Sequence, residues 1–129
     1  MPRPIVVTGG GGLLGSALKT LCPEAVFLTR KDGDFRDAAQ AGRIFQDLKP
    51  HAVLHLAARV GGVKFNEAHN TELLTENVQI NLNVLNAAWK SGVKRLVSVL
   101  SSCAFQFYPD RPSTEEDLQA GLPYDGNLG

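Results

Sequence analysis

A glycine-rich segment near the start of the chain has the spacing of a phosphate-binding turn. Gly9, Gly12 and Gly15 follow the pattern G-x-x-G-x-x-G, directly after an apolar run and before residues with helical spacing. Glycines there permit a tight turn, close approach of the backbone to a pyrophosphate, and packing of the helix on the strand. The alternative is a flexible turn without a ligand. We expect a dinucleotide to be held by Gly9, Gly10, Gly11, Gly12, Leu13, Leu14 and Gly15.

Two cations follow the next apolar run, where dinucleotide sites distinguish NAD from NADP. An acidic residue about 20 residues after the first glycine binds a ribose 2′-hydroxyl, whereas an arginine accommodates a 2′-phosphate. The run here ends in Thr29-Arg30-Lys31, which favours NADP(H), with Arg30 at the 2′-phosphate. The alternative is an ordinary solvated strand end. Asp34, further along the same loop, is a candidate to hydrogen-bond toward the adenine.

Hydroxyl and thiol side chains follow the last apolar run, at Ser101-Ser102-Cys103. A hydroxyl there can hydrogen-bond a substrate carbonyl oxygen, and a thiol with a tuned pKa can move a proton. The alternative is that these side chains are buried or form a turn. No Ser–His–Asp partnership is evident, so nucleophilic acyl transfer is not favoured. His55, inside an apolar run, is more typical of a hydrogen-bonded core histidine than of a catalytic one.

Small residues end the third apolar run, at Leu56-Ala57-Ala58. Small side chains at the carboxyl edge of a sheet let a cofactor lie against the backbone. The following segment, Arg59-Val60-Gly61-Gly62-Val63, is either a second ligand-binding glycine turn or only a strand-to-helix connection.

Alternating strands and helices must position these groups. Apolar runs predict strands over residues 5–7, 25–28, 52–57 and 96–100, and helices are predicted after the glycine turn, before Pro50, and from about Thr71 to Lys90. The alternation predicts right-handed crossovers and an α/β fold, a Rossmann-type doubly wound parallel sheet covered on both faces. The apolar positions that mark the long helix are Leu74, Val78, Leu82, Leu85 and Trp89.

Proline and glycine interrupt the pattern over residues 103–129, which we interpret as a loop or linker with one helical turn starting near Ser113. A chain that stops inside a loop is typical of an N-terminal fragment. We therefore expect one NAD(P)-binding domain over residues 1–129 that is incomplete at its C-terminus.

Bulk composition argues against several classes of protein. The chain has 129 residues, enough for one core, and its 13 basic and 13 acidic side chains cancel. No basic stripe predicts a nucleic-acid partner, and no apolar run or leader predicts a membrane partner, so we expect a cytoplasmic protein. Cys22 and Cys103 lack CxxC spacing and the 3 histidines form no zinc pattern, so we expect free thiols and no metal.

Three segments together resemble the extended short-chain dehydrogenase/reductases. They are Val7-Thr8-Gly9-Gly10-Gly11-Gly12-Leu13-Leu14-Gly15, His55-Leu56-Ala57-Ala58 with Val60-Gly61-Gly62, and Ser101-Ser102-Cys103. More narrowly, the chain resembles the branch of GDP-4-keto-6-deoxymannose 3,5-epimerase-4-reductases. The resemblance implies a GDP-sugar substrate, epimerisation at C3 and C5 through enolates of the 4-ketone, and hydride transfer from NADPH to C4.

The resemblance also implies residue roles. Ser101 would hydrogen-bond the 4-keto oxygen, Cys103 would donate or accept a proton in epimerisation, and Arg30 would meet the 2′-phosphate. A homodimer built from paired helices is implied as well and would use the long helix, unless that helix only covers the sheet. The cofactor would be lined by Ala57, Ala58, Phe65, Ile80 and Leu100.

The chain departs from the family after its last predicted strand. Family members carry a Tyr-x-x-x-Lys pair soon after a loop like residues 123–129, and no lysine lies four residues after Tyr124. The family's second epimerisation base, a histidine, and its substrate-binding C-terminal domain are also missing. We expect negligible reductase activity from this polypeptide alone. The alternatives are a non-catalytic NADP-binding module or short isoform, and another sugar-nucleotide epimerase or dehydratase.

Overall fold

The computed structural model describes residues 3–105 and 110–121 of the chain. These residues fall into two compact units. The first unit comprises Met1–Arg59 and Glu72–Val99 and contains the whole sheet, and the second comprises Val60–Thr71 and Leu100–Gly129.

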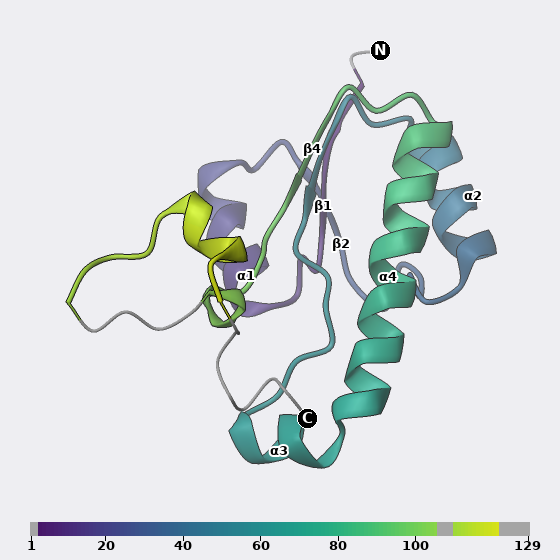
Figure 1. Cartoon of the computed structure of the whole chain (residues 1–129). Helices are drawn as coiled ribbons and strands as arrows, with labels where there is room; N and C mark the ends of the chain where they lie inside the picture. Colours follow the sequence, from purple (N-terminus) through teal and green to yellow (C-terminus); the bar gives the residue numbers. More distant parts are fainter. Residues whose placement is uncertain (1–2, 106–109, 122–129) are drawn as a thin grey trace. The chain divides into compact units, whose positions relative to one another are not determined.

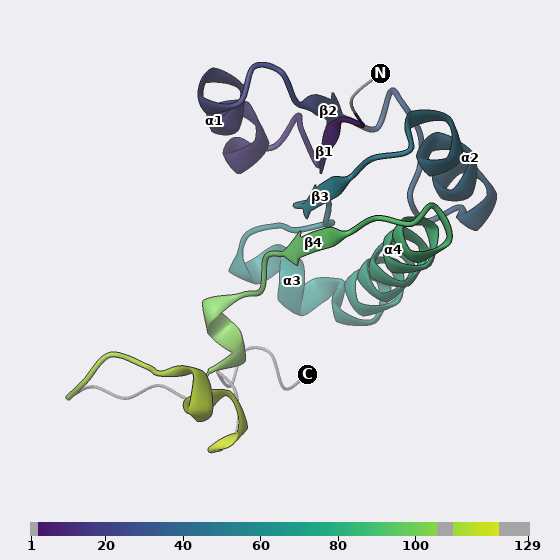
Figure 2. The same ribbon diagram turned by 90° about the horizontal axis from the view of Figure 1, so that it is seen from above.

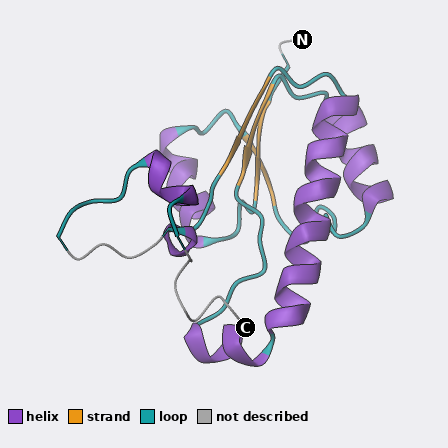
Figure 3. Cartoon of the chain, in the orientation of Figure 1, coloured by secondary structure: helices purple, strands orange, loops and turns teal. Residues whose placement is uncertain are grey.

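Four parallel strands form the sheet of the first unit (Figure 3). They are β1 Ile5–Thr8, β2 Val26–Leu28, β3 Ala52–His55 and β4 Arg95–Ser98. Their order is β2-β1-β3-β4, so the chain leaves β1 toward one edge of the sheet and returns to its other side with β3. This reversal makes the carboxyl ends of β1 and β3 the topological switch point, where open α/β sheets bind their ligands.

Helices cover both faces of this sheet (Figures 1 and 2). Helix α1 Leu13–Leu21 lies on one face, whereas α2 Ala38–Leu48 and α4 Asn70–Lys90 lie on the other. The predicted doubly wound α/β architecture is therefore confirmed. The strands begin and end within a few residues of the predicted bounds because short β-branched runs separated by turn residues mark them clearly.

The main core lies between the sheet and the pair α2 and α4. Its strand contributions include Val6 and Val53, which are 0% and 2% exposed. Phe45 of α2 meets the ring of Phe35 edge to face, with 6.5 Å between the ring centroids. Helix α4 adds a buried row, Ile80, Val84, Ala87 and Ala88.

Helix α4 carries a second apolar surface, which does not face this core. The predicted helix is confirmed, but its marker residues lie on the exposed side, from 45% exposure for Val78 to 77% for Trp89. We call this row the α4 stripe; it consists of Leu74, Val78, Leu82, Leu85 and Trp89. The packed side of the helix uses smaller residues at other positions.

Both long helices on this face end in local capping structures. Lys49 follows α2 in the left-handed conformation before Pro50, and Gly92, at φ +71°, ends α4 in a Schellman motif in which Val93 N donates to Ala88 O at 3.0 Å. The Arg3 guanidinium bridges the two ends. It donates to the carbonyl oxygens of Lys49, Pro50, Ser91 and Gly92 at 2.7–3.3 Å.

The second unit contains short helices that the sequence pattern predicted only in part. Helix α3 Val63–Ala68 was not predicted, because no apolar period marks it. The 3₁₀ helix η1 covers Ser102–Ala104, and η2 Glu115–Gln119 begins close to the predicted helical turn. Thr114 and Asp117 form a capping box at η2, and Arg111 forms a two-pronged ion pair with Asp117 that holds the pKa of this carboxyl well below its usual range.

Candidate nucleotide-binding site

The glycine turn leaves β1 at the switch point and lies against the backbone that follows β3. Gly9 has φ +71°, and a Cβ added to it would come within 2.8 Å of Leu56 C and Ala57 N. Gly15, in the first turn of α1, is equally constrained, since an added Cβ would lie 2.5 Å from Gly9 O. Both positions therefore require glycine, as the sequence pattern predicted.

The N-terminus of α1 opens this turn toward a ligand. Gly12 is the N-cap, with no side chain that could bond the first amides of the helix, and the first turn holds no acidic residue. Amides at a helix start have no carbonyl one turn earlier to pair with, and they carry the positive end of the helix dipole. Gly11, Gly12, Leu13 and Leu14 are exposed. The turn therefore has the geometry and the partial positive charge that can hold an anionic group such as a pyrophosphate.

A buried polar network links the carboxyl ends of β1 and β3 at the switch point. The Thr8 hydroxyl oxygen accepts hydrogen bonds from Leu56 N and Ala57 N, both at 3.2 Å. Both of its acceptor positions are thus used, so its proton is donated to His55 Nδ1, 2.7 Å away. The proton of the imidazole therefore sits on Nε2 and is donated to Asn81 Oδ1 at 3.0 Å.

His55 is accordingly a core histidine, as the sequence favoured. It is 3% exposed, and burial lowers its pKa, while the hydrogen bond with Asn81 opposes this shift. A neutral imidazole in a fixed tautomer joins β3 to β1 and α4.

The cations predicted to favour NADP over NAD lie on the turn after β2. Asp32 closes this turn by accepting from Thr29 N at 2.7 Å and from Thr29 Oγ1 at 2.8 Å. Arg30 and Lys31, between these two residues, are exposed. The turn therefore presents two cations to solvent at the carboxyl end of β2.

Asp34 is occupied by a neighbouring arginine. Its carboxylate accepts from Arg36 Nε at 2.9 Å and Nη2 at 2.5 Å, and also from Arg36 N. These hydrogen bonds lower the pKa of Asp34 to about 2. The predicted bond to an adenine therefore has to be made by a carboxylate that is already paired.

The predicted lining residues of the first unit differ in their surroundings. Ala57 is half-buried and Ala58 exposed at the end of β3, where a cofactor can lie against the backbone. Ile80 is only 6% exposed and belongs to the core between α4 and the sheet.

The remaining predicted residues belong to the second unit. Phe65 is 36% exposed and stacks on His69, with 4.2 Å between the ring centroids. Leu100 is 72% exposed, and Ser101 is exposed directly before η1. The backbone of Cys103 lies in η1, whereas its side chain lies outside the described part of the structure.

For three residues near the site the sequence predicted no binding or catalytic role. Thr8 and Asn81 were visible as polar residues in apolar elements, which is a weak signal for a buried hydrogen bond. Arg36 carries no sequence signal, because its partner Glu76 lies on α4, although Asp34 is a neighbour in the same loop.

The described residues contain neither a cluster of metal ligands nor a helix that could span a membrane. Within residues 3–105 and 110–121, no group of three or more His, Cys, Asp or Glu side chains is arranged to hold a metal ion. No helix in this part of the chain combines the length and apolarity needed to cross a membrane.

Comparison with known proteins places this geometry in context. Residues 5–127 match the NAD dependent epimerase/dehydratase family. The chain is 37% identical to the probable GDP-L-fucose synthase of Drosophila melanogaster and 35% identical to the GDP-L-fucose synthase of Dictyostelium discoideum, in both cases over 98% of this chain and 42% of the relative.

A solved structure of a similar protein also superposes on this chain. The GDP-L-fucose synthetase from Naegleria fowleri bound to NADP superposes with a TM-score of 0.85 at 38% identity, over 98% of this chain and 40% of that one. The chain thus spans about two-fifths of the length of these relatives.

Proposed function

Since the chain belongs to the NAD dependent epimerase/dehydratase family, we propose that it binds NADP(H) as the cofactor-binding part of a GDP-sugar epimerase/reductase of the GDP-L-fucose synthase type. One observation carries the proposal: the turn from Gly9 to Gly15 is pressed onto the end of β3 and opens at a helix N-terminus, beside exposed Arg30 and Lys31. The NADP in the Naegleria fowleri structure supports the choice of cofactor.

The exposed amides at the start of α1 and the exposed cations after β2 indicate how the cofactor would be oriented. The pyrophosphate would lie on the amides that begin α1, and the adenosine half would extend over the end of β2, with its 2′-phosphate at Arg30. The nicotinamide half would extend over the end of β3, against Ala57 and Ala58. When bound, NADPH would supply the hydride for reduction.

Ser101 and Cys103 would act on the sugar. The Ser101 hydroxyl would donate to the 4-keto oxygen, which favours loss of a proton from the adjacent carbon. Cys103 would supply one half of the proton exchange at C3 or C5, either removing the proton or returning one, and inversion of the carbon requires a second acid–base group on the opposite face of the sugar. In the reduction, hydride would add to C4 and the ketone oxygen would take a proton.

A nucleotide-binding module without catalysis is the second candidate. The 129 residues contain no Tyr-x-x-x-Lys pair, and an acid of this kind is needed to protonate the reduced oxygen. We expect the polypeptide to bind NADPH yet leave GDP-4-keto-6-deoxymannose unreduced. Measurable oxidation of NADPH that depends on this sugar would overturn the expectation.

The α4 stripe supports a homodimer. Five large apolar side chains on one exposed helix face repeat at the three- and four-residue steps of a helix-pairing surface. We expect Leu85→Glu, within the stripe, to shift a dimer to monomer in sedimentation velocity. Asn86→Glu, adjacent on the same helix, is the matched control, and a wild-type monomer at high concentration would contradict the assignment.

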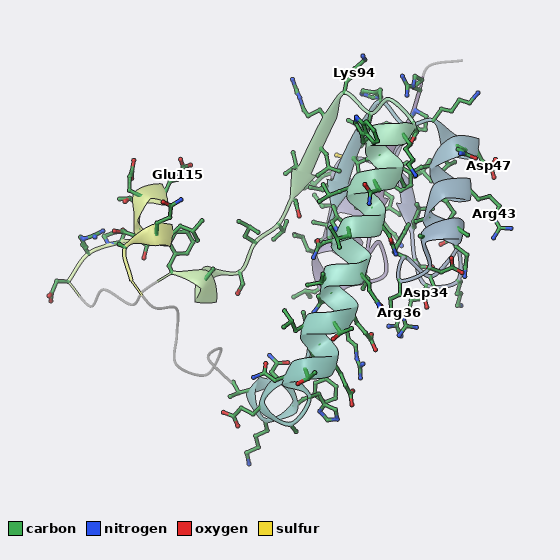
Figure 4. All side chains as sticks on the ribbon, turned by 45° about the vertical axis from the view of Figure 1, so that its right-hand side comes forward. Asp34, Arg36, Arg43, Asp47, Lys94 and Glu115 are labelled. Carbon is green, nitrogen blue, oxygen red and sulfur yellow. The ribbon has the colours of Figure 1, made fainter. Side chains whose placement is uncertain are left out.

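Titration of NADPH followed by fluorescence tests the cofactor proposal. We expect Arg30→Glu to weaken NADPH binding strongly, because it places a carboxylate where the 2′-phosphate would lie. Arg43→Glu makes the same change in charge on the exposed surface of α2 (Figure 4) and should leave the affinity nearly unchanged. Equal affinities of wild type and Arg30→Glu for NADPH would refute the proposed contact of Arg30 with the 2′-phosphate.

A further inference from the structure

The acidic side chains of the loop between β2 and α2 are engaged by partners other than Arg30. Asp32 is bound by the backbone and hydroxyl of Thr29, and Asp34 by the backbone and guanidinium of Arg36. Arg30, which precedes these acids in the loop, remains exposed. Asp37, the third acid of the loop, caps α2 by accepting from Ala39 N and Gln40 N. A loop with three acids therefore still presents positive charge at Arg30.

Arg36 is itself held in place from another element. Its Nη1 lies 3.1 Å from Glu76 Oε2 on α4, and Glu76 Oε1 in turn accepts from Arg59 Nη1 at 2.6 Å. The backbone of Arg59 pairs with the Asn77 amide in both directions, at 2.7 and 2.9 Å. The Arg36 guanidinium thus bridges the loop to α4 and is positioned to keep Asp34 paired.

Asp34 and Arg30 belong to the same loop, and the charge of Arg30 is among the influences that lower the pKa of Asp34. If Arg36 did not hold it, the Asp34 carboxylate would compete with an incoming phosphate for the Arg30 guanidinium and would also repel that phosphate. Figure 4 shows Asp34 and Arg36 together, below Arg43 and Asp47 of α2.

We propose that Arg36 is a specificity-determining residue, which favours NADP over NAD by holding Asp34 away from Arg30. This inference rests on the proposed NADP site. Arg36 does not need to touch the cofactor: its effect passes through the charge of Asp34. The effect should therefore appear with a ligand that carries a 2′-phosphate and be absent with one that lacks it.

The test compares the dissociation constants of NADP and NAD for the full chain, by calorimetry at low salt. We expect Arg36→Met to reduce the preference for NADP about fivefold, the size of effect that one exposed ion pair of the stronger kind produces. Adding Asp34→Asn to Arg36→Met should restore the preference, because the competing charge is then gone. The loss should shrink at high salt, where exposed charges are screened.

Arg43→Met removes the same charge from the exposed surface of α2 and is the matched control, with an unchanged preference expected. A purely structural role of Arg36 would weaken NADP and NAD binding equally and would not be restored by Asp34→Asn, and that result overturns the inference. An unchanged preference for NADP over NAD in Arg36→Met also overturns the inference. The proposed function still stands in that case if the wild type binds NADP. If the wild type binds neither nucleotide, both proposals are wrong.

Discussion

Replacing Gly9 by alanine tests the packing of the glycine turn on β3. At φ +71° an L-residue adopts the left-handed conformation, which costs about 1–2 kcal/mol. The new methyl group would also lie 2.8 Å from Leu56 C and Ala57 N, and such overpacking typically costs about 1–3 kcal/mol. We therefore expect Gly9→Ala to lower the free energy of unfolding by about 2–5 kcal/mol.

Urea unfolding followed by circular dichroism measures this change. Gly42→Ala is the matched control, because Gly42 lies inside α2 and an added Cβ meets nothing within 4 Å. It should raise the free energy of unfolding by about 0.5–1 kcal/mol, the usual gain for alanine over glycine in a helix. A Gly9→Ala variant that unfolds at the same urea concentration as the wild type would refute the close approach of the two backbones.

Two further substitutions test contacts that hold the first unit together. Arg3→Met removes hydrogen bonds from one guanidinium to carbonyl oxygens at the ends of α2 and α4, and we expect it to lower the free energy of unfolding by about 1–2 kcal/mol, with Arg43→Met unchanged in the same urea titration. Thr8→Val keeps the side-chain shape but leaves His55 Nδ1 and two backbone amides without their partner, so it should cost about 2–4 kcal/mol. Thr8→Ser keeps the hydroxyl and should cost clearly less; equal losses would contradict the assigned hydrogen bonds.

Local patterns predicted the parts of the fold that depend on near neighbours in sequence. The glycine turn and the strands were predictable because a β-branched run followed by glycines allows few conformations. Helix α3 was missed because residues 63–68 contain only Val63 and Phe65 as large apolar residues, too few to define a period. Period alone also could not tell which apolar face of α4 packs on the sheet: larger residues mark the stripe, while the core accepts Ala87 and Ala88.

The polar networks could not be predicted, because their members are far apart in the chain. Thr8 and His55 are separated by 47 residues, and His55 and Asn81 by 26. Strand order brings the first two together, and the placement of α4 adds the third. The sequence thus predicted candidate cofactor-binding residues, whereas contacts such as the ion pair of Arg36 with Glu76 follow only from the tertiary structure.

His55 should make the stability of the first unit depend on pH in a narrow range. Burial lowers its pKa below the ordinary 6.5, so in the unfolded chain this residue takes up its proton at a higher pH than in the folded chain. Its contribution to stability is therefore complete above pH 6.5 and is lost as the pH falls through the folded pKa. Burial disfavours the charged imidazolium. The geometry adds that a protonated Nδ1 would point a proton at Thr8 Oγ1, which already accepts two hydrogen bonds.

Unfolding in urea at pH 7 and pH 5 measures this linkage. Asp34 does not interfere, because its folded pKa of about 2 and its ordinary pKa of 3.8 both lie below this range. We expect the wild type to lose stability between the two values, and His55→Gln, although less stable at pH 7, to lose less over the same interval. The imidazole nitrogens give an independent readout, since ¹⁵N NMR at pH 7 should report a proton on Nε2 and none on Nδ1. An equal pH dependence in both proteins, or a proton on Nδ1, would show that the Thr8–His55–Asn81 network is assigned wrongly, and with it the support beneath the glycine turn.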